Sequence, residues 1–222
     1  MGKTIDYILF DLQCIAGLIS FLLSIRLIKN DSIPNYMKGF FWYSIVCMIV
    51  IINNFIKSHL FDNFTFATVI NNLSLIFHYS FLSVFIIKIT PKREEIRQVN
   101  FFLIVILILI IYLLVTHNLE KHVYQAFSLS GFGLSILCLI YYYQLFNNLP
   151  ILNLRKEPSF WIVTGVFFCM SIIVPSSAMI GYLKNKISEF NLIIIHDIAT
   201  FSYLVMHVFF IKAFLCSIQQ RQ

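Results

Sequence analysis

Long apolar runs make up most of this chain, and polar residues gather in short segments between them. A helix that crosses the hydrocarbon core of a bilayer needs about 20 mostly apolar residues, with a range of about 17–25. Seven runs are of about this length, the second and fourth being the shortest, and we predict a membrane helix in each. The predicted helices cover about residues 7–27, 40–56, 64–87, 101–116, 123–146, 159–183 and 191–216.

The segments between these runs are short and contain helix-breaking residues. Prolines and asparagines mark the connections at residues 29–35, 91–95 and 147–158, as expected where helices stop and restart. Short connections make consecutive helices antiparallel neighbours. The pattern therefore predicts an all-α protein, a seven-transmembrane-helix bundle that forms a single transmembrane domain over residues 1–222.

Composition supports a membrane protein. Hydrophobic residues make up 59% of the chain and charged residues 12%, and the mean hydropathy is +0.86. Soluble domains have about 25% charged residues, so this much apolar surface requires lipid as its solvent. The net charge of +6 comes from basic residues in the connections, which favours contact with lipid headgroups over nucleic acid.

The distribution of basic residues predicts the orientation. Of the 16 Lys and Arg residues, eleven fall on one side of the predicted bundle and five on the other. Short loops rich in Lys and Arg stay in the cytoplasm, so we expect the N-terminus outside and the C-terminus in the cytoplasm. We expect a multi-pass protein of the bacterial cytoplasmic membrane.

No motif for catalysis or metal binding is present. The sequence lacks H-E-x-x-H and G-x-S-x-G, which excludes those zinc protease and serine hydrolase signatures. The five cysteines lie within apolar runs without C-x-x-C spacing, which is typical of buried structural thiols. We expect no enzymatic activity, no cofactor and no metal site.

Polar side chains at membrane depth are the most informative residues for function, because they cost free energy unless they face partners inside the bundle. Six predicted helices carry such residues in their outer halves, including Gln125, Ser128 and Ser177 on the fifth and sixth. One interpretation is hydrogen bonding between helices. The other is a ligand pocket open to the outside, formed by Asp197, His196, Asn54, Asn71 and Asn72.

The last two predicted helices add a polar stripe and a candidate hinge. His196, Thr200, Tyr203 and His207 follow helical spacing, so they share one face that could line a path or pocket. Pro175 lies inside the sixth predicted helix, where proline frees a carbonyl and permits a kink. Our hypothesis is that Pro175 acts as a hinge.

Several function classes fit a bundle of this size. His78 and His207 could be axial haem ligands, and Lys212 on the last helix invites comparison with retinal proteins, although its position near the helix end favours a snorkelling lysine. A small transporter of SWEET-like size and a structural subunit of a membrane complex are further alternatives. A sensory module binding a small or lipidic ligand is our leading hypothesis.

Residues 154–165, with the sequence LRKEPSFWIVTG, carry a family resemblance. This stretch resembles a segment of small uncharacterised bacterial seven-transmembrane-helix proteins, which are similar to the membrane input regions of sensory histidine kinases. The resemblance implies a signalling role and assigns no catalytic or binding residue. Because the 222 residues contain no kinase domain, we expect any signal to pass to a membrane or cytoplasmic partner protein.

Overall fold

Seven long helices form the protein in the computed structural model, which describes residues 2–29, 33–59, 65–90, 96–117, 119–148, 154–183 and 189–219. They are α1 (Gly2–Lys29), α3 (Phe40–His59), α4 (Thr65–Ile89), α5 (Ile96–Thr116), α6 (Tyr124–Asn148), α7 (Pro158–Leu183) and α8 (Glu189–Gln219). All seven are long and apolar enough to cross a membrane. The predicted helical bundle and its seven spans are therefore confirmed.

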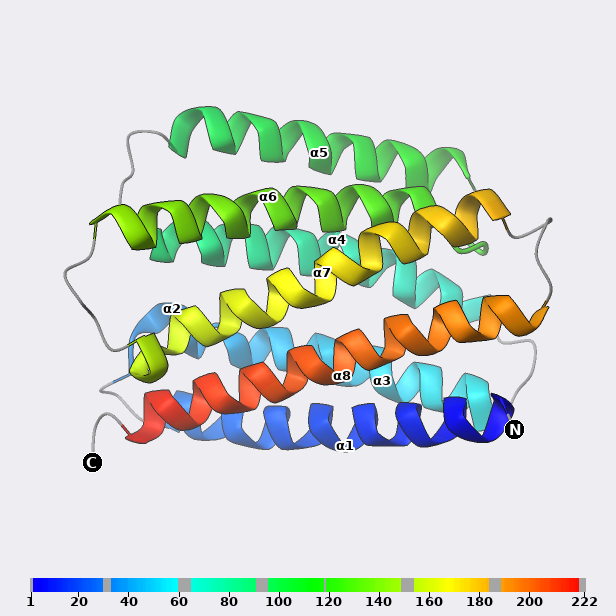
Figure 1. Ribbon diagram of the computed structural model, residues 1–222, viewed down its shortest axis with the longest axis horizontal. Coiled ribbons are helices and arrows are strands. Elements are labelled where there is room, and N and C mark those ends of the chain that lie inside the picture. The colour runs from blue at the N-terminus through cyan, green and yellow to red at the C-terminus, as the bar shows by residue number, and fades with distance from the viewer. Residues whose placement is uncertain are drawn as a thin grey trace.

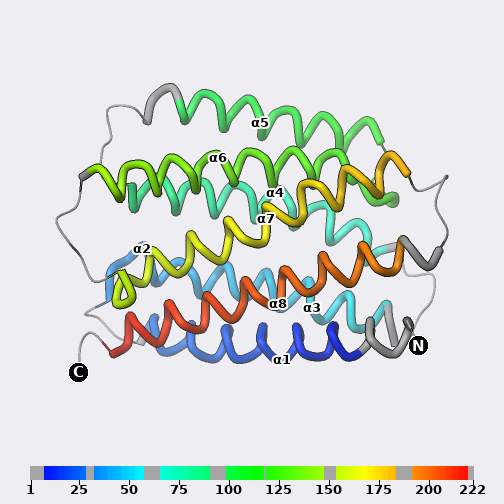
Figure 2. The backbone as a smooth tube through the Cα atoms, viewed as in Figure 1, coloured from blue at the N-terminus to red at the C-terminus, as the bar shows by residue number. Residues whose placement is uncertain are grey.

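The helices lie roughly side by side along one axis, with α1 starting at one end of the bundle and α8 finishing at the other (Figure 1). Every helix packs against the next one along the chain. Contacts between α1 and α8 and between α4 and α6 close a ring of six helices, and α5 packs outside it against α4 and α6. The tube in Figure 2 shows α5 at the edge, beyond α6 and α4.

The observed helices extend beyond the predicted spans. The two shortest predicted runs correspond to α3 with 20 residues and α5 with 21, so polar residues at their ends continue the helix. Two short elements were not anticipated, namely α2 (Asn35–Lys38) and the 3-10 helix η1 (Leu154–Lys156). α7 begins at Pro158, one residue before the predicted span, and at that first position the missing N–H of proline costs nothing.

An aromatic cluster fills the interior at the end of the bundle where α3 begins. Phe40 has an exposed fraction of 0% and packs edge-on against Phe85 of α4, with ring centroids 4.7 Å apart. Its ring also contacts Phe210 and Phe214 of α8, at 5.6 and 5.7 Å. Edge-to-face packing is the favoured geometry for such rings, and here it joins three helices.

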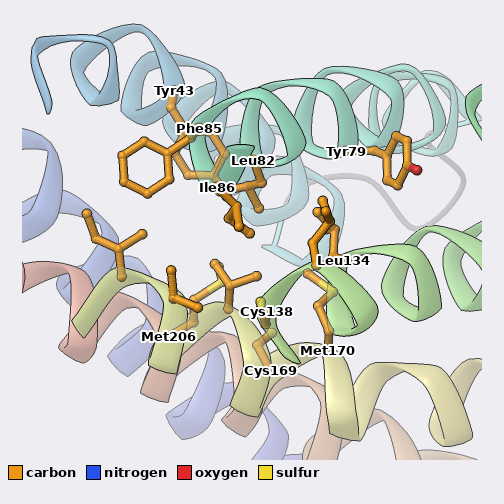
Figure 3. Close-up of a cluster of buried hydrophobic side chains, with 14 of the residues drawn as sticks. Tyr43, Tyr79, Leu82, Phe85, Ile86, Leu134, Cys138, Cys169, Met170 and Met206 are labelled. Carbon is orange, nitrogen blue, oxygen red and sulfur yellow. The ribbon is translucent and has the colours of Figure 1, made fainter. Parts of the chain in front are cut away.

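Aliphatic and sulfur-containing side chains continue the core toward α6 and α7. Figure 3 shows Leu82 and Ile86 of α4 across from Cys138 of α6 and Met206 of α8, and all four are buried. This part of the core contains no charged side chain among the buried residues that the structure describes. The interior of this half is therefore held mainly by dispersion and shape.

Glycines allow the closest helix contacts. A Cβ at Gly165 of α7 would lie 2.7 Å from Cβ of Phe209 and 3.3 Å from the carbonyl oxygen of Met206, both on α8. Small residues let membrane helices approach closely and gain van der Waals contact. Gly165 therefore sets the separation of α7 and α8.

We predict that Gly165→Ala destabilises the protein by about 1–3 kcal/mol, because the added methyl group overpacks this contact. The melting temperature of the detergent-purified variant should fall. Ser171→Ala is the control, since Ser171 is exposed on the same helix, and it should melt like the wild type. An unchanged melting temperature for Gly165→Ala would mean that α8 moves away from α7 without cost.

Candidate functional site

Asparagines join α3 to α4 in the half of the bundle away from the Phe40 cluster. The Asn71 amide nitrogen donates to Oδ1 of Asn54 at 2.9 Å. Asn53 is buried and donates from Nδ2 to the carbonyl oxygen of Ala67 at 3.2 Å. Two of the predicted site residues, Asn54 and Asn71, are thus brought together. This contact fits the hydrogen-bonding interpretation of these residues as well as the pocket interpretation.

Asn72 attaches α4 to the connection between α5 and α6. Its Nδ2 donates to the carbonyl oxygens of Leu119 and Lys121 at 2.8 and 2.9 Å, and its exposed fraction is 0%. Both amide hydrogens are therefore used. The residue fixes the loop that precedes the first turn of α6.

The side-chain carbonyl oxygens of Asn71 and Asn72 are buried, and no donor among the described residues reaches either one. A buried acceptor without a donor costs about 1–3 kcal/mol. Two of them on adjacent residues of α4 are acceptors that a hydroxyl, amine or water could satisfy.

The predicted residues of α8 have different environments. Asp197 is half-buried, whereas His196 is exposed. In the stripe that the sequence predicted, Thr200 and His207 are buried and Tyr203 is partly buried. The stripe therefore faces the interior from Thr200 onward and reaches the surface at His196. The assignment of Asp197 and His196 to one ligand site with the asparagines stays a prediction.

A thiol–imidazole pair lies at mid-depth, and the sequence analysis did not predict it. Sγ of Cys47 on α3 is 3.4 Å from Nε2 of His78 on α4. Nδ1 of His78 is 2.7 Å from the carbonyl oxygen of Ser74. Because a carbonyl only accepts, Nδ1 carries the proton and Nε2 accepts from the thiol. Both ring nitrogens of His78 therefore have a partner within the protein.

Two further polar groups surround this pair. The Tyr43 ring stacks edge-on against His78 with centroids 5.1 Å apart. The Tyr43 hydroxyl lies near the Cys47 thiol, but no described group meets it with hydrogen-bond geometry. Nδ1 of His207 on α8 is also buried without a partner among the described residues. Gly17 of α1 makes room for the Ile51 side chain, and a Cβ there would meet Nε2 of His207 only at an ordinary contact distance of 3.9 Å.

Pro175 lies on the outer face of α7 and is exposed. Next to it, the Ser128 hydroxyl of α6 donates to the carbonyl oxygen of Val174 at 3.2 Å. The proline removes the helix bond that its own N–H would make to the carbonyl of Ser171. A weakened turn of α7 is therefore attached directly to α6.

We predict opposite results for two buried tyrosines. The Tyr79 hydroxyl donates to the carbonyl oxygen of Leu103 at 3.2 Å, so Tyr79→Phe should destabilise the protein by about 0.5–1.5 kcal/mol. Within the described ranges, no acceptor meets the Tyr43 hydroxyl with hydrogen-bond geometry, so Tyr43→Phe should leave the melting temperature unchanged or raise it. Thermal unfolding in detergent measures both. Destabilisation by Tyr43→Phe would reveal that a water or ligand binds the hydroxyl.

Neither a group of metal ligands among the described residues nor a match to a known protein indicates which reaction or ligand the site serves. Among the described residues, no three His, Cys, Asp or Glu side chains are grouped so that they could hold a metal ion. No family model matches the chain, and no curated protein or solved structure matches it either.

Proposed function

We propose that this seven-helix membrane protein is a sensory or signalling module of the bacterial cytoplasmic membrane. It binds a small or lipidic ligand in its outer half and acts through a partner protein. The ligand site is formed by Asn71, Asn72, Asn54, Asp197 and His196.

The observation that carries this proposal is the pair of buried amide oxygens on Asn71 and Asn72. Polar groups inside a membrane bundle are costly without partners and mark functional positions. The amide nitrogens of the same residues are fully or partly used by the protein. The oxygens therefore select a ligand that donates hydrogen bonds.

The orientation follows from the basic residues. Lys88, Arg155 and Lys156 lie at the end of the bundle where α4 ends and α7 begins, and the positive-inside rule assigns this end to the cytoplasm. The asparagines lie near the other end of α3 and α4. The ligand then enters from outside.

Contacts at the cytoplasmic end connect α7 and α8 to the loop before α7. The carbonyl oxygen of Arg155 accepts from Nε1 of Trp161 at 2.9 Å and from Sγ of Cys216 at 3.6 Å. Nζ of Lys212 lies 5.9 Å from the centre of the Trp161 ring. A change in the bend of α7 at the Pro175 hinge moves this loop relative to α8. The cytoplasmic partner binds the surface of this loop.

We predict that Asp197→Asn weakens ligand binding by about 10–100-fold, because a charged hydrogen-bond acceptor contributes about 1.5–3 kcal/mol. Native mass spectrometry of the detergent-purified wild type should first show and identify a retained molecule. Titration with that molecule should then raise the melting temperature of the wild type but not of Asp197→Asn.

Asp11→Asn is the matched control, since Asp11 is an exposed carboxylate on α1, and it should bind like the wild type. A wild type that retains no molecule contradicts the proposal. So does an Asp197→Asn variant that melts at a lower temperature yet binds normally, which would make Asp197 a structural residue. Uptake of the retained molecule into proteoliposomes would favour the transporter of SWEET-like size instead.

A further inference from the structure

A groove with a volume of about 540 Å³ lies between α6 and α7, on a different side of the ring from the α3–α4 asparagines. This volume is within the range of about 300–1,000 Å³ that is usual for ligand sites. Its lining residues are Gln125, Ser128, Leu129, Phe132, Val174, Ser177, Ala178, Gly181 and Tyr182.

Two close helix contacts bound the groove. At one end, a Cβ on Gly131 of α6 would lie 2.8 Å from Cγ2 of Val174. At the other end, a Cβ on Gly181 of α7 would lie 3.3 Å from Cβ of Tyr124. Between them, the bond from the Ser128 hydroxyl to the Val174 carbonyl joins the two helices. The groove is therefore a fixed feature of the α6–α7 packing.

The mouth of the groove faces the membrane. Phe132, Ala178 and Tyr182 are exposed, with Tyr182 at 73%. All three lie within the candidate spans Tyr124–Asn147 and Pro158–Leu183. An opening on the outer surface of two membrane-spanning helices admits molecules from the bilayer.

The polarity of the lining changes with depth. Gln125 is the second residue of the α6 span, and Tyr182 is the second-last residue of the α7 span, so both lie near the bilayer surface. Phe132 lies seven residues further along α6, about 10 Å deeper at about 1.5 Å per residue. No lining residue carries a charge. The groove thus has an uncharged hydrogen-bonding end and an apolar end.

We propose that this groove binds one membrane glycerolipid through its ester region and one acyl chain. The ester carbonyls accept hydrogen bonds from the Gln125 amide and the Ser177 hydroxyl, and the chain runs along Leu129, Val174 and Phe132. A charged headgroup remains outside in the interface. The site is separate from the one proposed at the asparagines.

The test compares a diester phosphatidylcholine with its diether analogue, which keeps the chains and headgroup but lacks the ester carbonyls. Native mass spectrometry from mixed micelles measures how much of each lipid the full-length protein retains. The wild type should retain the diester in preference to the diether. Equal retention of the two lipids would overturn the assignment to the ester region.

Two substitutions on one face of α7 locate the lipid. Ala178→Leu places a larger side chain in the groove and should reduce diester retention by roughly tenfold or more. Ser171→Leu is the matched control, because Ser171 is exposed two turns away on the same face, and its retention should equal that of the wild type. Equal retention by both variants would overturn the site.

A second variant leaves the groove open. Gln125→Leu removes the amide donor on an exposed residue, and it should reduce the preference for the diester while keeping chain binding. A preference as large as that of the wild type would overturn the role of Gln125. The lipid retained in the groove and the ligand bound at the asparagine site are measured separately. A failure to find Asp197-dependent ligand binding would therefore not change the conclusion about the lipid.

Discussion

Hydrogen bonding inside the bilayer is the constraint on which this structure depends, because hydrocarbon offers polar groups no partner. Helices satisfy the backbone, and many hydroxyls are satisfied by their own helix. Ser44 donates to the carbonyl oxygen of Phe40, Thr90 to that of Ile86 and Ser171 to that of Phe167, all at 2.6–2.7 Å. These residues add polarity to the sequence without joining one helix to another.

Side-chain hydrogen bonds between helices occur in both halves of the part of the bundle that the structure describes. Asn54 and Asn71 join α3 to α4, Asn72 holds the loop before α6, and Ser128 joins α6 to α7, all in the half away from Phe40. In the half that contains the Phe40 rings, the hydroxyls of Tyr141 and Tyr142 on α6 donate to Ser159 and Thr164 on α7. Amide groups therefore dominate the contacts of one half, whereas packed rings and tyrosine hydroxyls dominate those of the other.

The fold could be predicted from sequence because seven apolar runs leave a membrane helix as the main option for each. The site could be predicted only in part. Ser74 and Ser130 are also polar residues in the outer halves of their helices, yet they donate to the carbonyls of Asn71 and Phe127 in their own helices. Gln125 lies on the surface. The rotation of a helix about its own axis decides whether a polar residue points inward. The sequence of a weakly amphipathic membrane helix gives little indication of that rotation.

Contacts between residues far apart in the chain could be predicted from the sequence even less well than helix rotation. The Cys47–His78 pair joins residues 31 positions apart on different helices, so no motif spacing could reveal it. The α6–α7 groove likewise depends on where Gly131 and Gly181 let the helices touch. A glycine in an apolar run indicates a close approach but does not identify the neighbour.

The positions of the two proposed sites relative to Pro175 give them different routes to α7. The groove adjoins the weakened turn itself, since Val174 lines it and also accepts the bond from Ser128. The asparagine site reaches the same place through Asn72, which fixes the carbonyls of Leu119 and Lys121 just before α6 begins at Tyr124. A ligand bound at Asn72 would therefore act on the end of α6 that forms one wall of the groove. If a lipid in the groove and a ligand at the asparagines both bias the α6–α7 contact, each should change the affinity of the other by the same factor.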